Sequence, residues 1–147
     1  MTIGKICSRE VDLADATESA ATAAARMNIR EVGTLIVLNP AKAPIGIVTD
    51  RDLALRVMGK HLDPETTLVG DIMTPDPKTV TETTPIEDCL SRMRAHGVRR
   101  MPVVDADGRL VGVVSLDDIL ELIFEEMSAL RGLFDSTGPR KLALKKD

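Results

Sequence analysis

A hydroxyl followed three residues later by a carboxylate occurs twice in the sequence. Each copy comes after a short apolar run and before an apolar stretch with helical spacing, and the paired residues are Thr49 with Asp52 and Ser115 with Asp118. The start of a helix offers unpaired backbone N–H groups and the positive end of the helix dipole, which suit a phosphate. A carboxylate one turn later can accept two hydrogen bonds from a diol such as a ribose. The two corners are therefore candidate parts of a nucleotide site.

The same spacing has a second interpretation that involves no ligand. Thr49-x-x-Asp52 and Ser115-x-x-Asp118 both fit an N-terminal capping box in which Asp replaces Glu. In that interpretation the four side chains only stabilise the helices that they open. The repetition favours the ligand interpretation, and both stay open at the level of sequence.

Composition narrows the classes of function. The 147 residues are 44% apolar but only 1% aromatic, with no Trp or Tyr, and the net charge is −4. Both the low aromatic content and the negative net charge argue against nucleic-acid binding, which relies on stacked aromatic rings and basic surfaces. Cys7 and Cys89 have no nearby metal-ligand partners and are expected to be core thiols in a reducing cytoplasm, while His61 and His96 lack a ligand cluster. No signal peptide or membrane-spanning run is apparent, so we expect a cytoplasmic protein with no membrane association.

The corners belong to a longer internal repeat. An offset of 66, the difference between Gly112 and Gly46, aligns residues 3–58 with 69–124 without a gap. Local patterns then predict the elements that position the corners. They are a helix from Glu18, strands Gly33–Leu38 and Ile45–Val48, a helix Asp50–Met58, a capping box Thr84–Glu87 opening a helix to about His96, strands Met101–Val104 and Leu110–Val114 around a turn Asp105–Gly108, and a helix from Leu116 to about Leu133.

Each repeat thus reads as strand, helix, strand, strand, helix. The predicted organisation is a first unit at 1–58, a polar connection at 59–68, a second unit at 69–125, and a helical extension with a loose tail at 126–147. Apolar side chains continue along the last helix beyond the repeat, from Leu120 to Phe134, and such a stripe indicates a dimer contact. Met27 and Met93 occupy equivalent apolar positions and are expected in the cores.

Several segments resemble the cystathionine-beta-synthase (CBS) domain: Gly46–Asp52, Met73–Pro75, His96–Asp105 and Gly112–Ile119. The resemblance covers residues 1–125. It implies a mixed α/β (α+β) fold with two β-α-β-β-α units related by a pseudo-twofold axis. It also implies a cleft that binds adenosine-containing ligands such as AMP, ADP, ATP or S-adenosylmethionine, association into homodimers, and a regulatory role without catalysis or a required cofactor.

The resemblance also assigns residues to two sites, in which one unit holds sugar and phosphate while the other unit holds the adenine. We expect the first corner to form the stronger nucleotide site, with Thr49, Arg51, Asp52, Lys78, Thr79, Val80, Val98, Arg99 and Arg100, together with Met73. The weaker site takes Asp12, Leu13, Val32, Gly33, Thr34, Ser115 and Asp118, together with Cys7.

The charged residues near each corner are the reason why we expect the first site to bind a nucleotide more strongly than the second. Three arginines around the first corner suit phosphate groups, whereas Asp117 takes the place of Arg51 at the second corner and opposes them. The second site is then weaker, empty, or suited to an uncharged or cationic adenosyl group.

These observations leave three functions to compare. The first is a stand-alone module that binds an adenine nucleotide and transmits a conformational signal to an effector protein. The second is a structural or dimerising module without a physiological ligand. The third is a sensor of S-adenosylmethionine or NAD(H). The sequence shows no nucleophile–base pair, metal cluster or glycine-rich phosphate loop, so we do not expect an enzyme.

Overall fold

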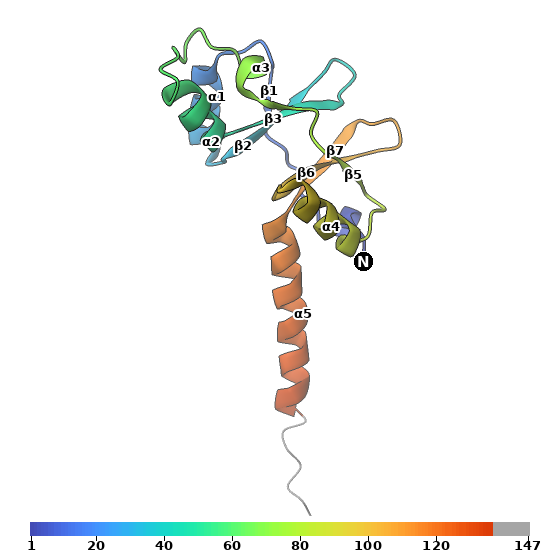
Figure 1. The fold of residues 1–147 in the computed structure, drawn as a ribbon. Coiled ribbons are helices and arrows are strands. Elements are labelled where there is room, and N and C mark those ends of the chain that lie inside the picture. The colour runs from blue at the N-terminus through green and yellow to red at the C-terminus, as the bar shows by residue number, and fades with distance from the viewer. Residues whose placement is uncertain (137–147) are drawn as a thin grey trace, which may run out of the picture.

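The computed structural model describes residues 1–136 and shows two small α+β units side by side, with one long helix extending away from the second (Figure 1). The first unit contains β1 (Leu13–Ala14), α1 (Ala20–Arg30), β2 (Thr34–Leu38), β3 (Pro44–Thr49), α2 (Asp50–Asp52) and the π-helical turns of Leu53–Met58. The second repeat contributes α3 (Val69–Ile72) and β4 (Thr74–Pro75) to the first unit. The second unit is formed by β5 (Val80–Thr81), α4 (Ile86–His96), β6 (Arg100–Val104), β7 (Leu110–Ser115) and α5 (Leu116–Ser136), and a 3₁₀ turn (Ile3–Lys5) lies near the N-terminus. The predicted fold class and the order of elements in each repeat are confirmed.

The two sheets have the same strand register. In the first sheet β2 and β3 are antiparallel with Thr34 opposite Thr49, and in the second β6 and β7 are antiparallel with Arg100 opposite Ser115. Each register shifts once, after Val37 and after Val103. All these positions are related by the offset of 66. The corner hydroxyl therefore ends the second strand of the hairpin in both units, beside the start of the first strand.

The segment that opens each repeat, residues 3–8 in the first and 69–75 in the second, is called the lead-in segment here. It packs on the unit formed by the hairpin of the other repeat. Thr74 of β4 pairs with Ile47 of β3 in the first sheet, and Ser8 pairs with Val113 of β7 in the second. The first core accordingly contains the apolar residues of α3, and the second contains Ile3. Because the exchange runs in both directions, it relates the two units as a twofold axis does and ties them into one module.

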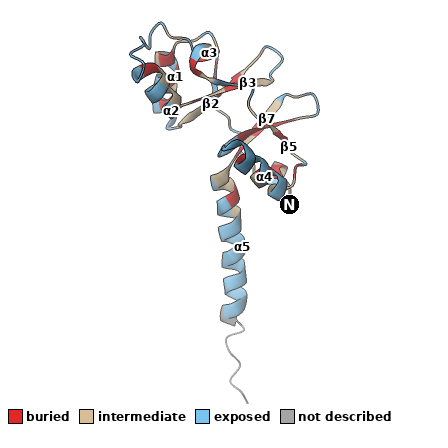
Figure 2. Ribbon diagram, viewed as in Figure 1, coloured by how far each residue is buried: buried red, intermediate tan, exposed pale blue. Residues whose placement is uncertain are grey.

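Both cores consist of aliphatic and sulfur-containing side chains, as the composition requires. Leu35, Val37 and Val48 are fully buried in the first, and Met101 and Val114 are fully buried in the second. Met27 and Met93 are 6% and 4% exposed, which confirms their predicted core positions. Figure 2 shows this burial concentrated in the strands and the inner helix faces, whereas most of α5 is exposed. No helix among residues 1–136 is both long and apolar enough to span a bilayer.

The helix boundaries depart from the prediction in two places. The capping box at Thr84 is wrong, because its hydroxyl accepts a hydrogen bond from the backbone N–H of Thr81 (3.0 Å) and no side chain caps α4. The predicted helix Asp50–Met58 is helical throughout, but its second half has π-type bonds, including one from Gly59 N to Ala54 O (2.8 Å). α5 continues to Ser136, and the predicted loose tail lies outside the described residues.

Candidate functional site

Both corners form the capping box that the sequence allows. At the second corner the backbone N–H of Ser115 donates to Asp118 Oδ2 (2.7 Å), and the N–H of Asp118 donates to Ser115 Oγ (3.1 Å). The corresponding distances at Thr49 and Asp52 are 2.9 and 3.2 Å. In each box the carboxylate uses Oδ2 for the cap. The other oxygen, Oδ1, is the atom that a ligand could engage, so capping and binding are compatible.

The two carboxylates differ in what surrounds Oδ1. Asp52 Oδ1 lies 3.5 Å from Arg56 Nε, and the Arg56 guanidinium is held in place by the carbonyl oxygens of Ile72 and Met73. The residue equivalent to Arg56 in the second repeat is Leu122, and within the described residues Asp118 has no ion-pair partner. Asp118 therefore keeps an acceptor oxygen for a ligand, whereas Asp52 is already paired.

A cavity of about 310 Å³ lies beside Asp118, between the two units. Its walls come from the N-terminal segment, the α1–β2 junction of the first unit, and β6, β7 and α5 of the second. The structure thus brings together most of the residues predicted for the second site, and adds others that the sequence did not suggest. The lining residues are Ser8, Glu10, Val11, Asp12, Glu31, Val32, Gly33, Thr34, Ile36, Arg100, Val113, Ser115 and Asp118.

Arg100 lies in this cavity and not with the Asp52 set to which it was assigned. Its Nη1 donates to Thr34 Oγ1 (3.2 Å), a hydrogen bond that joins the two units across the cavity. The reason is register: Arg100 stands opposite Ser115 in the β6–β7 pair and so accompanies it to the same end of the sheet. The signal in the sequence for this position is the strand pairing that sets Arg100 opposite Ser115.

The charges that ordered the two sites are also arranged differently from the prediction. Asp117 is not a lining residue of the cavity; its Oδ1 lies 3.6 Å from Arg99 Nη2, and both side chains are largely exposed. The carboxylates that do line the cavity are Glu10, Asp12, Glu31 and Asp118, and of these Asp12 pairs with Arg30 (2.7 Å). One guanidinium therefore faces several carboxylates, and the cavity is acidic overall.

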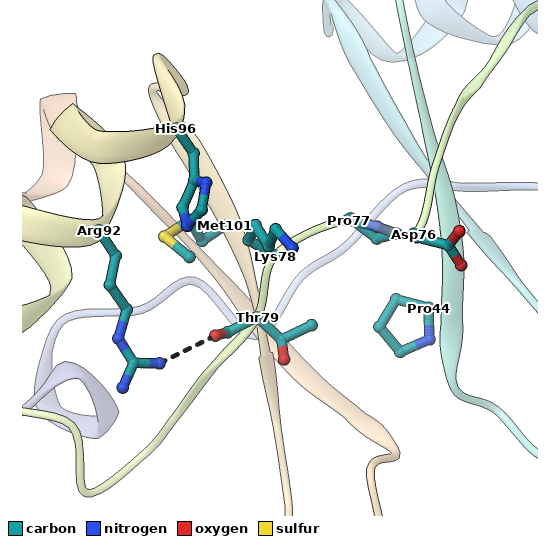
Figure 3. A pocket seen from close by; sticks show the side chains of 8 residues that line it. All are labelled: Pro44, Asp76, Pro77, Lys78, Thr79, Arg92, His96 and Met101. Carbon is teal, nitrogen blue, oxygen red and sulfur yellow. Dashed lines mark hydrogen bonds between the residues drawn. The ribbon is translucent and has the colours of Figure 1, made fainter.

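The residues predicted for the Asp52 site are dispersed. Lys78 and Thr79 line another cavity, of about 510 Å³, and neither Thr49 nor Asp52 is among its lining residues. Figure 3 shows it between the α4 side of the second unit and Pro44 of the first, with the Arg92 guanidinium donating to the Thr79 carbonyl (3.4 Å). The remaining lining residues are Pro44, Asp76, Pro77, Arg92, His96 and Met101.

Four other residues predicted for the two sites do not line the Asp118 cavity. The side chain of Val80 is 1% exposed in the second core, so only its backbone could meet a ligand. Arg51 is exposed, and Val98 is 36% exposed. Leu13, on β1, is 42% exposed and is not among the residues lining the Asp118 cavity.

Cys7 and the possible metal ligands were the other candidate reactive groups, and the structure describes their surroundings. Cys7 packs against the second core, and burial is the main cause that raises the pKa of its thiol, so the thiol stays protonated near neutral pH. Among the described residues there is no group of three or more His, Cys, Asp or Glu side chains arranged to hold a metal ion.

Comparison with known proteins gives consistent matches. A family model described as the CBS domain matches the chain twice, over residues 3–59 and 69–125. An uncharacterized protein of Methanopyrus kandleri is 33% identical over 122 residues, which is 83% of this chain and 62% of that protein. The chain therefore spans less than two thirds of that relative.

Two solved structures share the fold. The crystal structure of Hypoxic Response Protein I with two coordinated zinc ions has a TM-score of 0.74 at 30% identity, covering 82% of this chain and 98% of that one. The crystal structure of CBSX2 from Arabidopsis thaliana in complex with AMP has a TM-score of 0.73 at 27% identity, covering 86% and 98%.

Proposed function

The chain belongs to the CBS-domain family, and on that basis we propose that its Asp118 cavity binds an adenosine-containing ligand and that binding alters the affinity of the module for an effector protein. The observation that carries the proposal is the cavity itself, which both units line and into which Asp118 brings a carboxylate oxygen not used by its cap. The complex of CBSX2 with AMP supports the ligand class.

The lining residues fit the parts of a nucleoside. Asp118 Oδ1 would accept hydrogen bonds from the ribose diol. The adenine would lie between the apolar side chains of Val11 and Ile36, against the backbone of the Val32–Thr34 segment, whose N–H and C=O groups can read its edge. A volume of about 310 Å³ is at the small end of the range for ligand sites, which suits a nucleoside better than a nucleoside triphosphate.

The charged residues that line the cavity further narrow the class of ligand. Arg100 is the one guanidinium in the lining, while Glu10, Glu31 and Asp118 carry carboxylates that no ion pair among the described residues neutralises. A polyphosphate would be repelled by this wall, whereas an uncharged or sulfonium group at the 5′ position would not. We therefore expect the order S-adenosylmethionine and 5′-methylthioadenosine first, AMP next, and ATP last.

The cavity also offers a route from binding to signal. Arg100 and Thr34 join the two units across it, so a ligand that displaces or strengthens their hydrogen bond changes how the units are held together. The resulting shift is limited by the difference in ligand affinity between the two arrangements. The effector protein is the recipient of this change in shape.

Isothermal titration calorimetry with adenosine, 5′-methylthioadenosine, S-adenosylmethionine, AMP and ATP tests the proposal, with thermal shift as a second readout. A ligand at 100 times its dissociation constant should add about 2.7 kcal/mol to the free energy of unfolding. Tightest binding by ATP would contradict the charge argument. If none of the five ligands binds, the module is structural, and the capping boxes alone explain Thr49, Asp52, Ser115 and Asp118.

A further inference from the structure

The cavity of about 510 Å³ lies on the opposite face of the second sheet from the Asp118 cavity. Met101 of β6 lines the larger cavity, whereas its neighbour Arg100 lines the Asp118 cavity, and successive residues of a strand point to opposite faces of a sheet. The larger cavity is bounded by α4, by the segment 76–79 that connects the two sheets, and by Pro44 of the first unit (Figure 3). It is therefore a separate site from the one beside Asp118.

The equivalent positions of the first repeat hold two ion pairs. The Arg26 guanidinium donates two hydrogen bonds to the Glu18 carboxylate, one of them 2.8 Å long. Four residues further along α1, Arg30 Nε lies 2.7 Å from Asp12 Oδ1. Both guanidinium groups of α1 are thus neutralised by carboxylates of the first repeat.

The second repeat keeps the basic member of each pair but replaces both carboxylates. Thr84 and Lys78 stand where the first repeat has its two acids. Among the residues that the structure describes, Lys78, Arg92 and His96 form no ion pair. The Arg92 guanidinium instead donates to the Thr79 carbonyl at 3.4 Å. The positions that correspond in the two repeats are Glu18 and Thr84, Arg26 and Arg92, Asp12 and Lys78, and Arg30 and His96.

The loss of both acids leaves this cavity with unneutralised positive charge. Lys78, Arg92 and His96 all line it, and Asp76, the carboxylate among its lining residues, lies at the end of the cavity away from Arg92 (Figure 3). Lys78 and Arg92 repel each other, and an anion bound between them would offset this repulsion. A phosphate group suits the set, because a guanidinium can bind it through two parallel N–H bonds and an ammonium as a point charge.

We propose that this cavity binds a small phosphate-bearing metabolite, with the phosphate held by Lys78, Arg92 and His96. The volume of about 510 Å³ lies within the range of small-molecule sites and leaves room for an organic part beside the phosphate. The apolar side chains of Pro44 and Met101 would contact that part. The site shares no lining residue with the Asp118 cavity, so the two ligand proposals can fail independently.

Lys78→Asp and Lys60→Asp are a matched pair of variants for testing the site. Lys78→Asp restores the acid that the first repeat has at this position, whereas Lys60→Asp makes the same change of charge at an exposed residue outside the cavity. The probes are pyrophosphate and glucose 6-phosphate, with glucose as the uncharged control, in isothermal titration calorimetry of the full chain. Wild type and Lys60→Asp should bind both phosphates and not glucose, and Lys78→Asp should bind them at least about 10-fold more weakly.

Arg92→Gln provides a second variant in the same cavity and should also weaken binding of both phosphates. Circular dichroism should show equal melting temperatures for all variants, because Lys60, Lys78 and Arg92 are exposed. Three results would overturn the proposal: a wild type that binds neither phosphate at millimolar concentrations, equal losses in Lys78→Asp and Lys60→Asp, or glucose binding as tight as that of glucose 6-phosphate. Binding that Arg100→Gln abolishes and Lys78→Asp leaves intact would place the anion in the Asp118 cavity and would also refute the proposal.

Discussion

Replacing Asp118 by Asn tests the assignment of the ligand site while leaving the helix cap in place. The amide oxygen of Asn can still accept the hydrogen bond that the Ser115 N–H now donates to Oδ2 at 2.7 Å. The second carboxylate oxygen becomes an NH₂ group, which cannot accept from a ribose hydroxyl. A hydrogen bond to a charged group contributes about 1.5–3 kcal/mol, so affinity for 5′-methylthioadenosine should fall roughly 10- to 150-fold.

Asp52→Asn is the matched control. Asp52 forms the same cap, with 2.9 Å between Thr49 N and Oδ2, but its other oxygen faces Arg56 and it does not line the Asp118 cavity. The two variants should therefore have similar melting temperatures without ligand. Only Asp118→Asn should lose affinity in calorimetry, and an equal or larger loss in Asp52→Asn would refute the reasoning and restore the order of sites that charge predicted from sequence.

Three further results follow from the packing and the ionisation of single groups. Gly112→Ala places a methyl group 2.7 Å from a carbonyl oxygen of the N-terminal lead-in segment, so it should lower the free energy of unfolding, measured by urea titration, by about 1–3 kcal/mol. Gly132→Ala meets nothing within 4 Å and should raise the free energy of unfolding by about 0.5–1 kcal/mol. Equal effects of the two variants would contradict the exchange of lead-in segments. The hydrogen bonds from Arg26 lower the pKa of Glu18, so the charged carboxylate adds stability above its unfolded pKa of about 4.3, and this stability is lost as the pH falls through the lower native pKa. Arg26→Gln should therefore flatten the decline of the melting temperature between about pH 5 and pH 3. An unchanged decline would show that the Arg26–Glu18 pair contributes nothing to stability. Burial raises the pKa of the Cys89 thiol, which is 0% exposed, so iodoacetamide at about pH 8 should label it slowly in the native protein and rapidly in urea; rapid native labelling would mean that the second core opens readily.

The sequence by itself determined the repeat, the order of elements and the two capped corners. These follow from local physics: alternating apolar runs predict strands, helical spacing predicts helices, and a hydroxyl three residues before a carboxylate caps the helix that follows. The helix predicted to run to about His96 ends there, because the next residue, Gly97, adopts the left-handed conformation with φ of 63°. The capping box predicted at Thr84 shows the limit of such patterns, because the Thr84 hydroxyl accepts a hydrogen bond from the backbone N–H of Thr81 and does not cap α4.

Only the tertiary structure decided which corner faces a cavity and with which charges. The lead-in segments cross to the opposite units, Arg100 follows its strand partner Ser115, Asp117 turns to Arg99, and Arg56 closes off Asp52. The two corners are nearly identical in sequence, so their difference arises from residues brought to them by packing, often from the other repeat. The spacing of residues along the chain determines which secondary structure a segment forms. Whether a corner residue faces a cavity depends on long-range contacts, and the spacing carries no information about these.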